Sequence, residues 1–369
     1  MTQTFVSNQE IILEARRNLE QGPWDYLVSG AESETTMRRN RLGFDRIALR
    51  PRVLRDVSRV DPSTTFLGHR LRIPVMLSPI GVLELYAEEG AVASAKAAAE
   101  FGTIQVLSSG ARPGWEKTAA STTAPKVFQF SARGDMFGGG DGTQSTGGLI
   151  ADAVKAGYVA VCLTTDTSGP SPKFGRRVER ALLNRFKPPR MIEPDGRGKA
   201  TRTWDTVDRI KEIAGVPLLV KGIATGEDAA IAVEHGVDVL WVSNHGGRNL
   251  DHGRGTIQML PEIVQAVAGR AAVVLDGGIQ RGGDVLKAIA LGANAVAIGK
   301  LQGFGLAAAG VAGLVRVLEI LEEEMAGTMA SLGISRLDEL DRSFVCAAEH
   351  VTWPHEMSQF VHLGEGRVR

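Results

Sequence analysis

Residues 237–251 read Val-Asp-Val-Leu-Trp-Val-Ser-Asn-His-Gly-Gly-Arg-Asn-Leu-Asp, and this stretch decides how the chain folds. Its first half is a short apolar run of β-branched and aromatic residues, which is typical of a strand buried on both faces in a parallel sheet. The second half begins at Ser243 and is polar, so His245 and Arg248 follow closely on the end of the strand. The sequence therefore predicts a buried strand whose carboxyl end carries two side chains suited to chemistry.

Seven more apolar runs of this kind end in a small or polar residue, at residues 74–78, 103–108, 126–130, 159–164, 216–221, 272–276 and 295–299. Helix-like stretches follow nearly all of them, for example residues 89–101, 227–235 and 283–291. Eight strand–helix units predict an α/β fold, a (β/α)8 TIM barrel with its active site at the carboxyl ends of the strands. A doubly wound open sheet is less favoured, because Ser78-Pro79-Ile80-Gly81 is not a dinucleotide-binding glycine fingerprint.

The 369 residues are interpreted as one domain, because a TIM barrel routinely uses this length. Residues 1–70 form an N-terminal helical extension, with a capped helix expected over residues 8–19, and are expected to cover one end of the barrel. Residues 71–325 form the barrel core. Residues 326–369 form a C-terminal helical segment and tail.

Composition argues for a small-molecule substrate. Lys+Arg and Asp+Glu both number 42, so net charge gives no reason to expect nucleic acid or an anionic membrane as a partner. There is no signal-peptide pattern and no run of 18 uncharged apolar residues, which predicts a cytoplasmic protein. Cys162 and Cys346 lack metal-ligand or redox spacing, and no metal site is expected at the C-terminal histidines, His350, His355 and His362.

His245 and Arg248, which follow the strand at residues 239–243, are suited to removing a proton from a substrate that carries an anionic group. Histidine removes a proton near neutral pH, and arginine binds a carboxylate through two parallel hydrogen bonds. A lone histidine at a strand end is more often structural, so the pair carries the argument. Lys221 ends another apolar run, where its charge is costly unless it is used.

The string from Ser243 to Asp251 resembles the signature of the FMN-dependent α-hydroxy-acid oxidase and dehydrogenase family, and the resemblance extends from Trp24 to Gly299. It implies oxidation of an (S)-2-hydroxy acid to the 2-oxo acid, with FMN as cofactor and a tetramer or octamer as the assembly. It also implies that His245 is the base and Asp166 its carboxylate partner. By the same resemblance the substrate carboxylate is held by Tyr26, Arg177 and Arg248.

The resemblance assigns a set of FMN-binding residues as well. Lys221 supports the negative charge of the reduced flavin ring, and the phosphate lies between the loops after the seventh and eighth strands. The remaining positions match strand ends or loops around the ring and phosphate: Pro79, Ile80, Gly81, Ser108, Gln129, Thr164, Ser243, Asp276, Gly277, Gly278 and Gly299.

This chain departs from the family pattern at both ends of the expected site. Gln280 and Lys300 stand where the family usually has arginine, which predicts weaker FMN binding unless Arg281 compensates. On the substrate side, Ser131 replaces a tyrosine and Gly110 replaces a bulky aromatic. Two lost rings predict a substrate larger than glycolate or lactate.

Three other functions stay open. One keeps the flavin chemistry but oxidises an amine, an amide or a natural-product intermediate. Another is a phosphate-ligand barrel without a redox step, and the third is a degenerate, non-catalytic binding protein. The electron acceptor, whether oxygen, a quinone or a protein, is also open.

Overall fold

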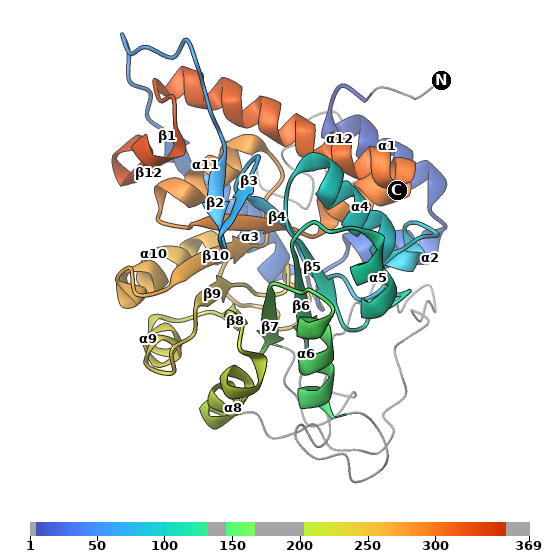
Figure 1. The fold of residues 1–369 in the computed structure, drawn as a ribbon. Helices are drawn as coiled ribbons and strands as arrows, with labels where there is room; N and C mark the ends of the chain where they lie inside the picture. Colours follow the sequence, from blue (N-terminus) through green and yellow to red (C-terminus); the bar gives the residue numbers. More distant parts are fainter. Residues whose placement is uncertain (1–4, 132–144, 167–202, 352–369) are drawn as a thin grey trace.

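A computed structural model describes residues 5–131, 145–166 and 203–351 (Figure 1). Eight parallel strands close into a barrel, in which each strand pairs with the next and the last pairs with the first. All eight predicted strands are confirmed: β4 (Val75–Leu77), β5 (Gln105–Ser108), β6 (Lys126–Phe130), β7 (Ala160–Thr164), β8 (Leu218–Ile223), β9 (Val239–Val242), β10 (Ala272–Asp276) and β11 (Ala295–Ile298). The α/β TIM-barrel prediction is therefore correct.

Helices surround the barrel, as the strand–helix alternation predicts. They are α4 (Ala91–Phe101), α5 (Trp115–Ser121), α6 (Thr146–Lys155), α8 (Trp204–Ala214), α9 (Gly226–Glu234), α10 (Thr256–Val267), α11 (Gly282–Ala290) and α12 (Lys300–Leu332). A short 3-10 turn, η1 (Leu83–Leu85), precedes α4.

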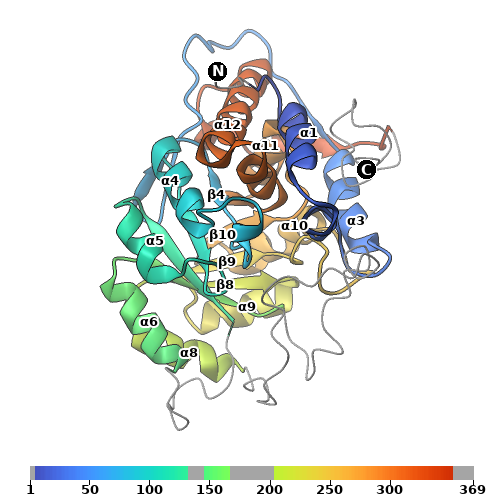
Figure 2. The ribbon, with the colours of Figure 1, turned by 90° about the vertical axis from the view of Figure 1, so that its right-hand side faces the viewer.

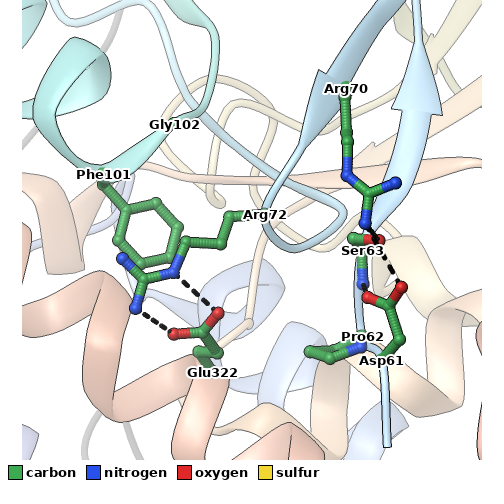
Figure 3. Close-up of a pocket in the computed structure, with 8 residues that line it drawn as sticks. All are labelled: Asp61, Pro62, Ser63, Arg70, Arg72, Phe101, Gly102 and Glu322. Carbon is green, nitrogen blue, oxygen red and sulfur yellow. Dashed lines mark hydrogen bonds and ion pairs between the residues drawn. The ribbon is translucent and has the colours of Figure 1, made fainter.

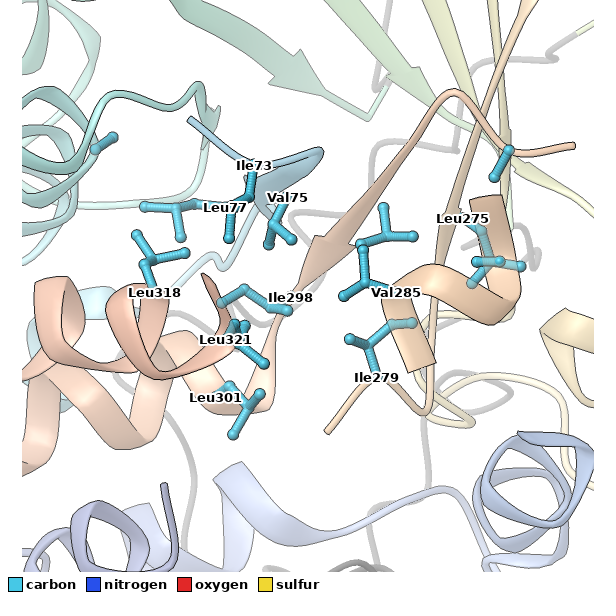
Figure 4. Close-up of a cluster of buried hydrophobic side chains, with 14 of the residues drawn as sticks. Ile73, Val75, Leu77, Leu275, Ile279, Val285, Ile298, Leu301, Leu318 and Leu321 are labelled. Carbon is cyan, nitrogen blue, oxygen red and sulfur yellow. The ribbon is translucent and has the colours of Figure 1, made fainter. Parts of the chain in front are cut away.

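Strand side chains alternate between two apolar layers. In β9, Val239 and Trp241 point into the barrel, where they pack with other inward residues such as Met76, while Leu240 and Val242 belong to the outer layer. Figure 4 shows part of that outer layer, where side chains from β4, β10 and β11 pack against α11 and α12. Both faces of each strand are thus buried, which is why the strands appear in the sequence as continuous apolar runs.

The N-terminal extension contacts both ends of the barrel, rather than the single end that the sequence predicts. It contains α1 (Asn8–Asn18), α2 (Gln21–Val28), α3 (Thr35–Asp45), β1 (Ile47–Leu49) and a hairpin of β2 (Thr64–Phe66) and β3 (His69–Leu71). Phe66 and Leu71 of the hairpin join the inner cluster and close the amino-terminal end of the barrel. At the other end, Asn40 of α3 exchanges two amide hydrogen bonds with Asn244, of 2.9 and 2.7 Å.

Helix α1 forms where the sequence predicts it, and the Ser7 side chain accepts a hydrogen bond from the Glu10 N–H at its start. Figure 2 shows α1 alongside α12, against which it packs, and α3 on the side of α10. The described chain ends with η3 (Leu337–Glu339), η4 (Arg342–Phe344) and β12 (Val345–Ala347), which pairs with β1.

The boundary expected between residues 325 and 326 lies inside α12, which is kinked at Ala309–Gly310 and ends at Leu332. Among the described residues α12 is also the one helix long and apolar enough to cross a membrane. Its most apolar 18-residue window is 61% buried inside the fold, as in a core helix of a globular protein.

Candidate active site

His245 and Asp166 meet at the carboxyl end of the barrel, which we call the mouth. His245 follows β9, Asp166 follows β7, and the imidazole Nδ1 lies 2.9 Å from Asp166 Oδ1. A carboxylate at Nδ1 favours the tautomer with the proton on that nitrogen, so that Nε2 carries the lone pair of a base. The backbone N–H of His245 also donates to Ser243 Oγ at 3.1 Å, which fixes the turn that presents the ring.

A glycine bulge in β8 makes room for the Asp166 carboxylate. Gly222 has a φ of +112°, and a Cβ there would lie 2.8 Å from the backbone nitrogen and from the Cβ of Asp166. The register between β8 and β9 shifts at this point, between Lys221 and Ile223. Only glycine fits this conformation and this close approach, so Gly222 positions the pair formed by His245 and Asp166.

Arg248 is anchored by the end of α2. Its Nη1 donates to the carbonyl oxygens of Tyr26 at 2.6 Å and Ser29 at 2.9 Å. Its guanidinium carbon lies 4.6 Å from the centre of the Tyr26 ring. Tyr26 and Arg248, two of the residues expected at the substrate carboxylate, thus contact each other through a cation–π interaction that orients the guanidinium. Arg177, the other predicted carboxylate ligand, lies outside the described residues.

Lys221 lies in a buried polar cluster at the bottom of the mouth. Its Nζ is 2.6 Å from Ser243 Oγ and 3.2 Å from Asp276 Oδ2, and it lies 5.6 Å from the centre of the Trp241 ring. Burial alone would lower the pKa of Lys221, but the charges of Asp276 and Asp166 outweigh it, so the net shift is upward. A fixed positive charge therefore lies beneath the mouth.

Other predicted residues line the mouth at neighbouring strand ends. Gln129 Nε2 donates to Thr164 Oγ1 at 2.8 Å, and the backbone N–H of Gly110 donates to Ser108 Oγ at 3.2 Å. Ser108 is paired in register with Gln129, so Gly110 and the half-buried Ser131, each two residues further on, leave adjacent strands at the same edge.

Glycines leave part of the mouth without side chains. An ideal Cβ at Gly110 would have Ser108 Oγ and backbone atoms of Gly81 as its nearest neighbours, at 3.6 to 3.8 Å. An ideal Cβ at Gly81 would meet only Ser108 Oγ, at 3.8 Å. Among the described residues, both positions could hold a Cβ in ordinary van der Waals contact, so the backbone is not tightly packed at these glycines.

The loop after β10 is tied to α3 rather than left open. Gly277 and Gly278 have φ near +90°, and a Cβ at either would lie within 3.2 Å of Asn40 atoms. The buried Arg41 guanidinium makes two hydrogen bonds to Asp284, of 2.9 and 3.0 Å, and also donates to the carbonyl of Gly278. These glycines are thus needed for packing against the extension, whatever else the loop binds.

The two cations expected near the phosphate already have partners. Arg281 Nε lies 3.2 Å from Glu324 Oε1 of α12, so its guanidinium is directed at a carboxylate. Lys300 Nζ donates to the carbonyl of Val28 at 2.8 Å and lies 2.6 Å from Met37 Sδ. Gln280 uses its backbone N–H on Asp284 Oδ2, at 3.0 Å.

Three residues at the mouth were missed by the sequence interpretation. Ser78 follows β4, and its Oγ is buried without a hydrogen-bond partner among the described residues. Tyr86 is 5% exposed, and burial raises the pKa of its hydroxyl. Tyr26 and Arg248 are close enough to it to influence that pKa. Asn249 Nδ2 donates to the carbonyl of Asp166 at 2.9 Å. Asn249 lies within the string from Ser243 to Asp251. No sequence spacing predicts that Ser78 and Tyr86 lie at the mouth.

A second pocket lies at the opposite end, between the β2–β3 hairpin, the end of α4 and α12 (Figure 3). Its two arginines are both paired. Arg72 donates to Glu322, with Nε at 2.8 Å, and lies 4.5 Å from the Phe101 ring centre, while Arg70 lies 3.2 Å from Asp61. Its two carboxylates, Asp61 and Glu322, are taken up by these arginines, and the active sites of TIM barrels lie at the other end. The mouth is therefore the candidate active site.

Comparison with known proteins places this arrangement in a family. The chain is 38% identical to glycolate oxidase of Spinacia oleracea over 367 residues, covering 93% of this chain and 96% of the relative. It is 39% identical to L-lactate oxidase of Nostoc sp. over 359 residues, covering 90% and 95%. A crystal structure of mandelate oxidase with (S)-2-phenylpropionate superposes with a TM-score of 0.84 at 32% identity, covering 95% of this chain and 100% of the other.

The family model described as FMN-dependent dehydrogenase matches residues 15–347, which include most of the extension, the whole barrel and both members of the histidine–carboxylate pair. The chain therefore belongs to the FMN-dependent dehydrogenase family and is an FMN-dependent oxidoreductase.

Proposed function

We propose that the protein oxidises an (S)-2-hydroxy acid larger than glycolate or lactate to the 2-oxo acid, with His245 as the base. The observation that carries the proposal is the 2.9 Å pair between His245 and Asp166 at the same barrel mouth as the anchored Arg248. A base beside a carboxylate-binding group suits a substrate whose reacting carbon is adjacent to a carboxylate.

The mouth has features that fit FMN. Lys221 supplies a buried positive charge for a ring that gains negative charge on reduction, and the buried Ser78 hydroxyl is an unused donor. Gly81 and Gly299 present backbone where a Cβ would meet no other atom closer than 3.8 Å, which leaves room for a flat ring and its side chain. Bound FMN would accept the two electrons that leave the substrate.

The protein's own groups would handle the carboxylate and the proton. Arg248 binds the substrate carboxylate through the nitrogens that do not contact the end of α2, and the Tyr26 ring orients the guanidinium. His245 Nε2 then takes the proton from the substrate. Asp166 stabilises the resulting imidazolium through its contact with Nδ1, which raises the basicity of the ring before the transfer.

Two small residues support the proposed size of the substrate. Gly110 and Ser131 leave adjacent strand ends, and neither carries a large side chain. A ring missing at each position frees space on the scale of one aromatic substituent, since an aromatic side chain buries about 150–250 Å². The relative that holds (S)-2-phenylpropionate accommodates a phenyl group beside a carboxylate, which supports an aryl or long alkyl 2-hydroxy acid.

An anaerobic titration tests the proposal. The purified protein, loaded with FMN, is mixed with (S)-2-hydroxy acids from glycolate to large aryl and alkyl members, and flavin bleaching is followed. We expect the large members to bleach the flavin at lower concentrations than glycolate, and Ser131→Tyr to reduce this preference. Tight, rapid reduction by glycolate would refute the size argument, and a flavin that no hydroxy acid bleaches would refute the reaction.

The second candidate is oxidation of an amine, an amide or a natural-product intermediate on the same scaffold. The small residue at Ser131 favours it, because a hydroxyl on a short side chain leaves the reacting group of the substrate less constrained. Arg248 at the mouth argues for a carboxylate. The same titration with amino and amide analogues separates the two candidates.

A further inference from the structure

The turn that carries His245 has an unusual backbone. His245, Gly246 and Gly247 have φ angles of +59°, +67° and +75°, which all lie in the left-handed region. Glycine adopts this region freely, but a residue with a Cβ does so at a cost, so His245 is the strained member of the three. Such a conformation persists only where the surrounding structure holds it in place.

The side chain of Asn244 supplies part of that support. Its Oδ1 accepts a hydrogen bond from the Gly247 N–H at 3.0 Å, and the backbone carbonyl of Asn244 accepts from the same N–H, also at 3.0 Å. Both bonds span His245 and Gly246, so they close the turn around the residue that carries the imidazole. Asn244 Nδ2 also donates to the carbonyl of Arg254 at 3.0 Å. The Asn244 amide is therefore part of the turn itself.

Asn40 of α3 holds this amide from the N-terminal extension. Asn40 is 2% exposed, its Nδ2 donates to Asn244 Oδ1 at 2.9 Å, and its Oδ1 accepts from Asn244 Nδ2 at 2.7 Å. With the bonds to Gly247 and Arg254, these contacts use all four hydrogen-bonding positions of the Asn244 amide. Asn40 Oδ1 also accepts from the Thr256 N–H at 3.0 Å, which ties Asn40 to the start of α10. The Asn244 side chain is thus fixed in one orientation.

The backbone of the extension lies against the same turn. The Ala31 N–H donates to the carbonyl of Gly247 at 2.8 Å, and a Cβ at Gly247 would lie 2.5 Å from the backbone nitrogen of Met37. Arg248, which follows the turn, has separate anchors, because it donates to two carbonyls at the end of α2. Losing the Asn40 amide should therefore disturb the imidazole more than it disturbs the guanidinium.

We infer that Asn40 is a positioning residue for His245. By fixing the Asn244 amide, Asn40 holds the left-handed turn in the form that places the imidazole 2.9 Å from Asp166. Its effect on the reaction rests on the proposed role of His245 as the base, whereas its effect on the position of the imidazole does not. The N-terminal extension then serves the chemical step as well as the packing of the barrel.

Anaerobic stopped-flow reduction of the full-length, FMN-loaded protein measures the effect on the chemical step, with (S)-mandelate as the probe. Because misplacing a reacting group by about 1 Å can cost 10²-fold, Asn40→Ala should lower the limiting rate of flavin reduction about 10- to 100-fold. The dissociation constant of (S)-mandelate should stay within about threefold of the wild-type value, since Arg248 keeps its own anchors.

A double-mutant cycle separates this role from a general loss of packing. If Asn40 acts through Asn244, the variant with both Asn40→Ala and Asn244→Ala should reduce its flavin no more slowly than Asn244→Ala alone. The matched control is Asn18→Ala, because Asn18 ends α1 in the same extension and donates to the carbonyls of Ala307 and Ala308, at 3.0 and 3.1 Å. This control should lose stability in urea and keep the wild-type rate of reduction.

A spectroscopic readout needs no substrate. The Nδ1 proton between His245 and Asp166 should give a downfield proton NMR resonance in the wild type, identified by its absence from His245→Ala. Asn40→Ala should shift this resonance or broaden it through exchange with water. Asn18→Ala should leave it unchanged.

Two results would overturn the inference. The first is an unchanged Nδ1 proton resonance in Asn40→Ala. The second is a double variant that is slower than Asn244→Ala by the full factor that Asn40→Ala shows alone, because the two residues would then act independently. Failure of the proposed function gives a different result: His245→Ala would reduce its flavin normally, and the resonance would still decide whether Asn40 positions the imidazole.

Discussion

The two ends of the barrel are built from the same strands and are both covered by the N-terminal extension, yet they differ in how their polar groups are satisfied. At the closed end, Phe66 and Leu71 fill the barrel, and the nearby Arg70 and Arg72 are each paired with a carboxylate. At the mouth, Lys221 is also paired, with Asp276, but Ser78 is a buried hydroxyl without a hydrogen-bond partner among the described residues. The polar groups of one end are satisfied by the chain itself, whereas the other end has a buried hydroxyl that a ligand could satisfy.

The largest effect is expected from removing the base at the mouth. His245→Ala should slow flavin reduction by substrate about 10²- to 10⁴-fold, the usual contribution of general base catalysis, and leave FMN bound. Stopped-flow reduction and the visible spectrum measure the two quantities. Normal reduction in this variant would show that the pair with Asp166 is structural and would remove the distinction between the two ends.

A substitution at the closed end is expected to lower stability without affecting substrate binding. Phe66→Ala should lower the free energy of unfolding by about 3–5 kcal/mol, because it leaves a cavity among packed side chains, and should leave KM unchanged for the remaining folded protein. Urea unfolding and steady-state kinetics check this. A marked rise in KM would show that packing at the closed end affects substrate binding at the mouth, and the two ends would then not be independent.

A smaller effect, dependent on pH, is expected at Asp251, which ties the extension to the mouth. Burial alone would raise the pKa of Asp251, but hydrogen bonds from Ser33 and from the Thr36 N–H outweigh it and lower the pKa to about 2. The carboxylate therefore contributes stability above its unfolded pKa of 3.8, and that contribution is lost as pH falls through about 2.

Asp251→Asn is the variant that tests this. Between pH 4 and pH 2 the wild type should lose roughly 1–2 kcal/mol more stability than the variant, as judged from urea midpoints measured at each pH. Parallel curves for the two proteins would mean that the contacts of Asp251 do not depend on its charge.

The smallest effect is expected from the exposed pair at the closed end. Arg72 is 46% exposed in its side chain, so Arg72→Ala should change the free energy of unfolding by only about 0–1 kcal/mol and leave FMN affinity and turnover as they are. A large loss of activity would show that the pocket of Figure 3 has a function of its own.

The elements that could be predicted are those with a local signal. The strands were located to within two residues because each is a short apolar run, and α1 was located because Ser7 caps it. The extra length of β8 was missed, since Gly222 continues the strand through a bulge that a periodic pattern does not reveal. The hairpin at Leu67–Gly68 was also missed, because each of its strands is only three residues long and gives too short a pattern to recognise.

The site shows the same limit more clearly. His245 and Arg248 stand three residues apart in one string, so their types and spacing could be interpreted directly. The partners that decide their geometry are far away in sequence: Gly222 beside Asp166, the carbonyl of Tyr26 on Arg248, and Glu324 on Arg281. Whether Arg281 compensates for Gln280 depends on its contact with Glu324, which no local pattern predicts, because this contact joins the start of α11 to α12.

The contacts between the extension and the mouth also set an order in time for a chain made from its N-terminus. Asn40 bonds to a residue 204 positions later, Arg41 to one 243 positions later, and the carbonyl of Tyr26 accepts from one 222 positions later. At synthesis rates of 5–20 residues per second, α2 and α3 emerge roughly 10–50 s before the loops that they will bind. Those two helices are therefore without their final partners for most of synthesis, and the active site is among the last parts of the molecule to be assembled.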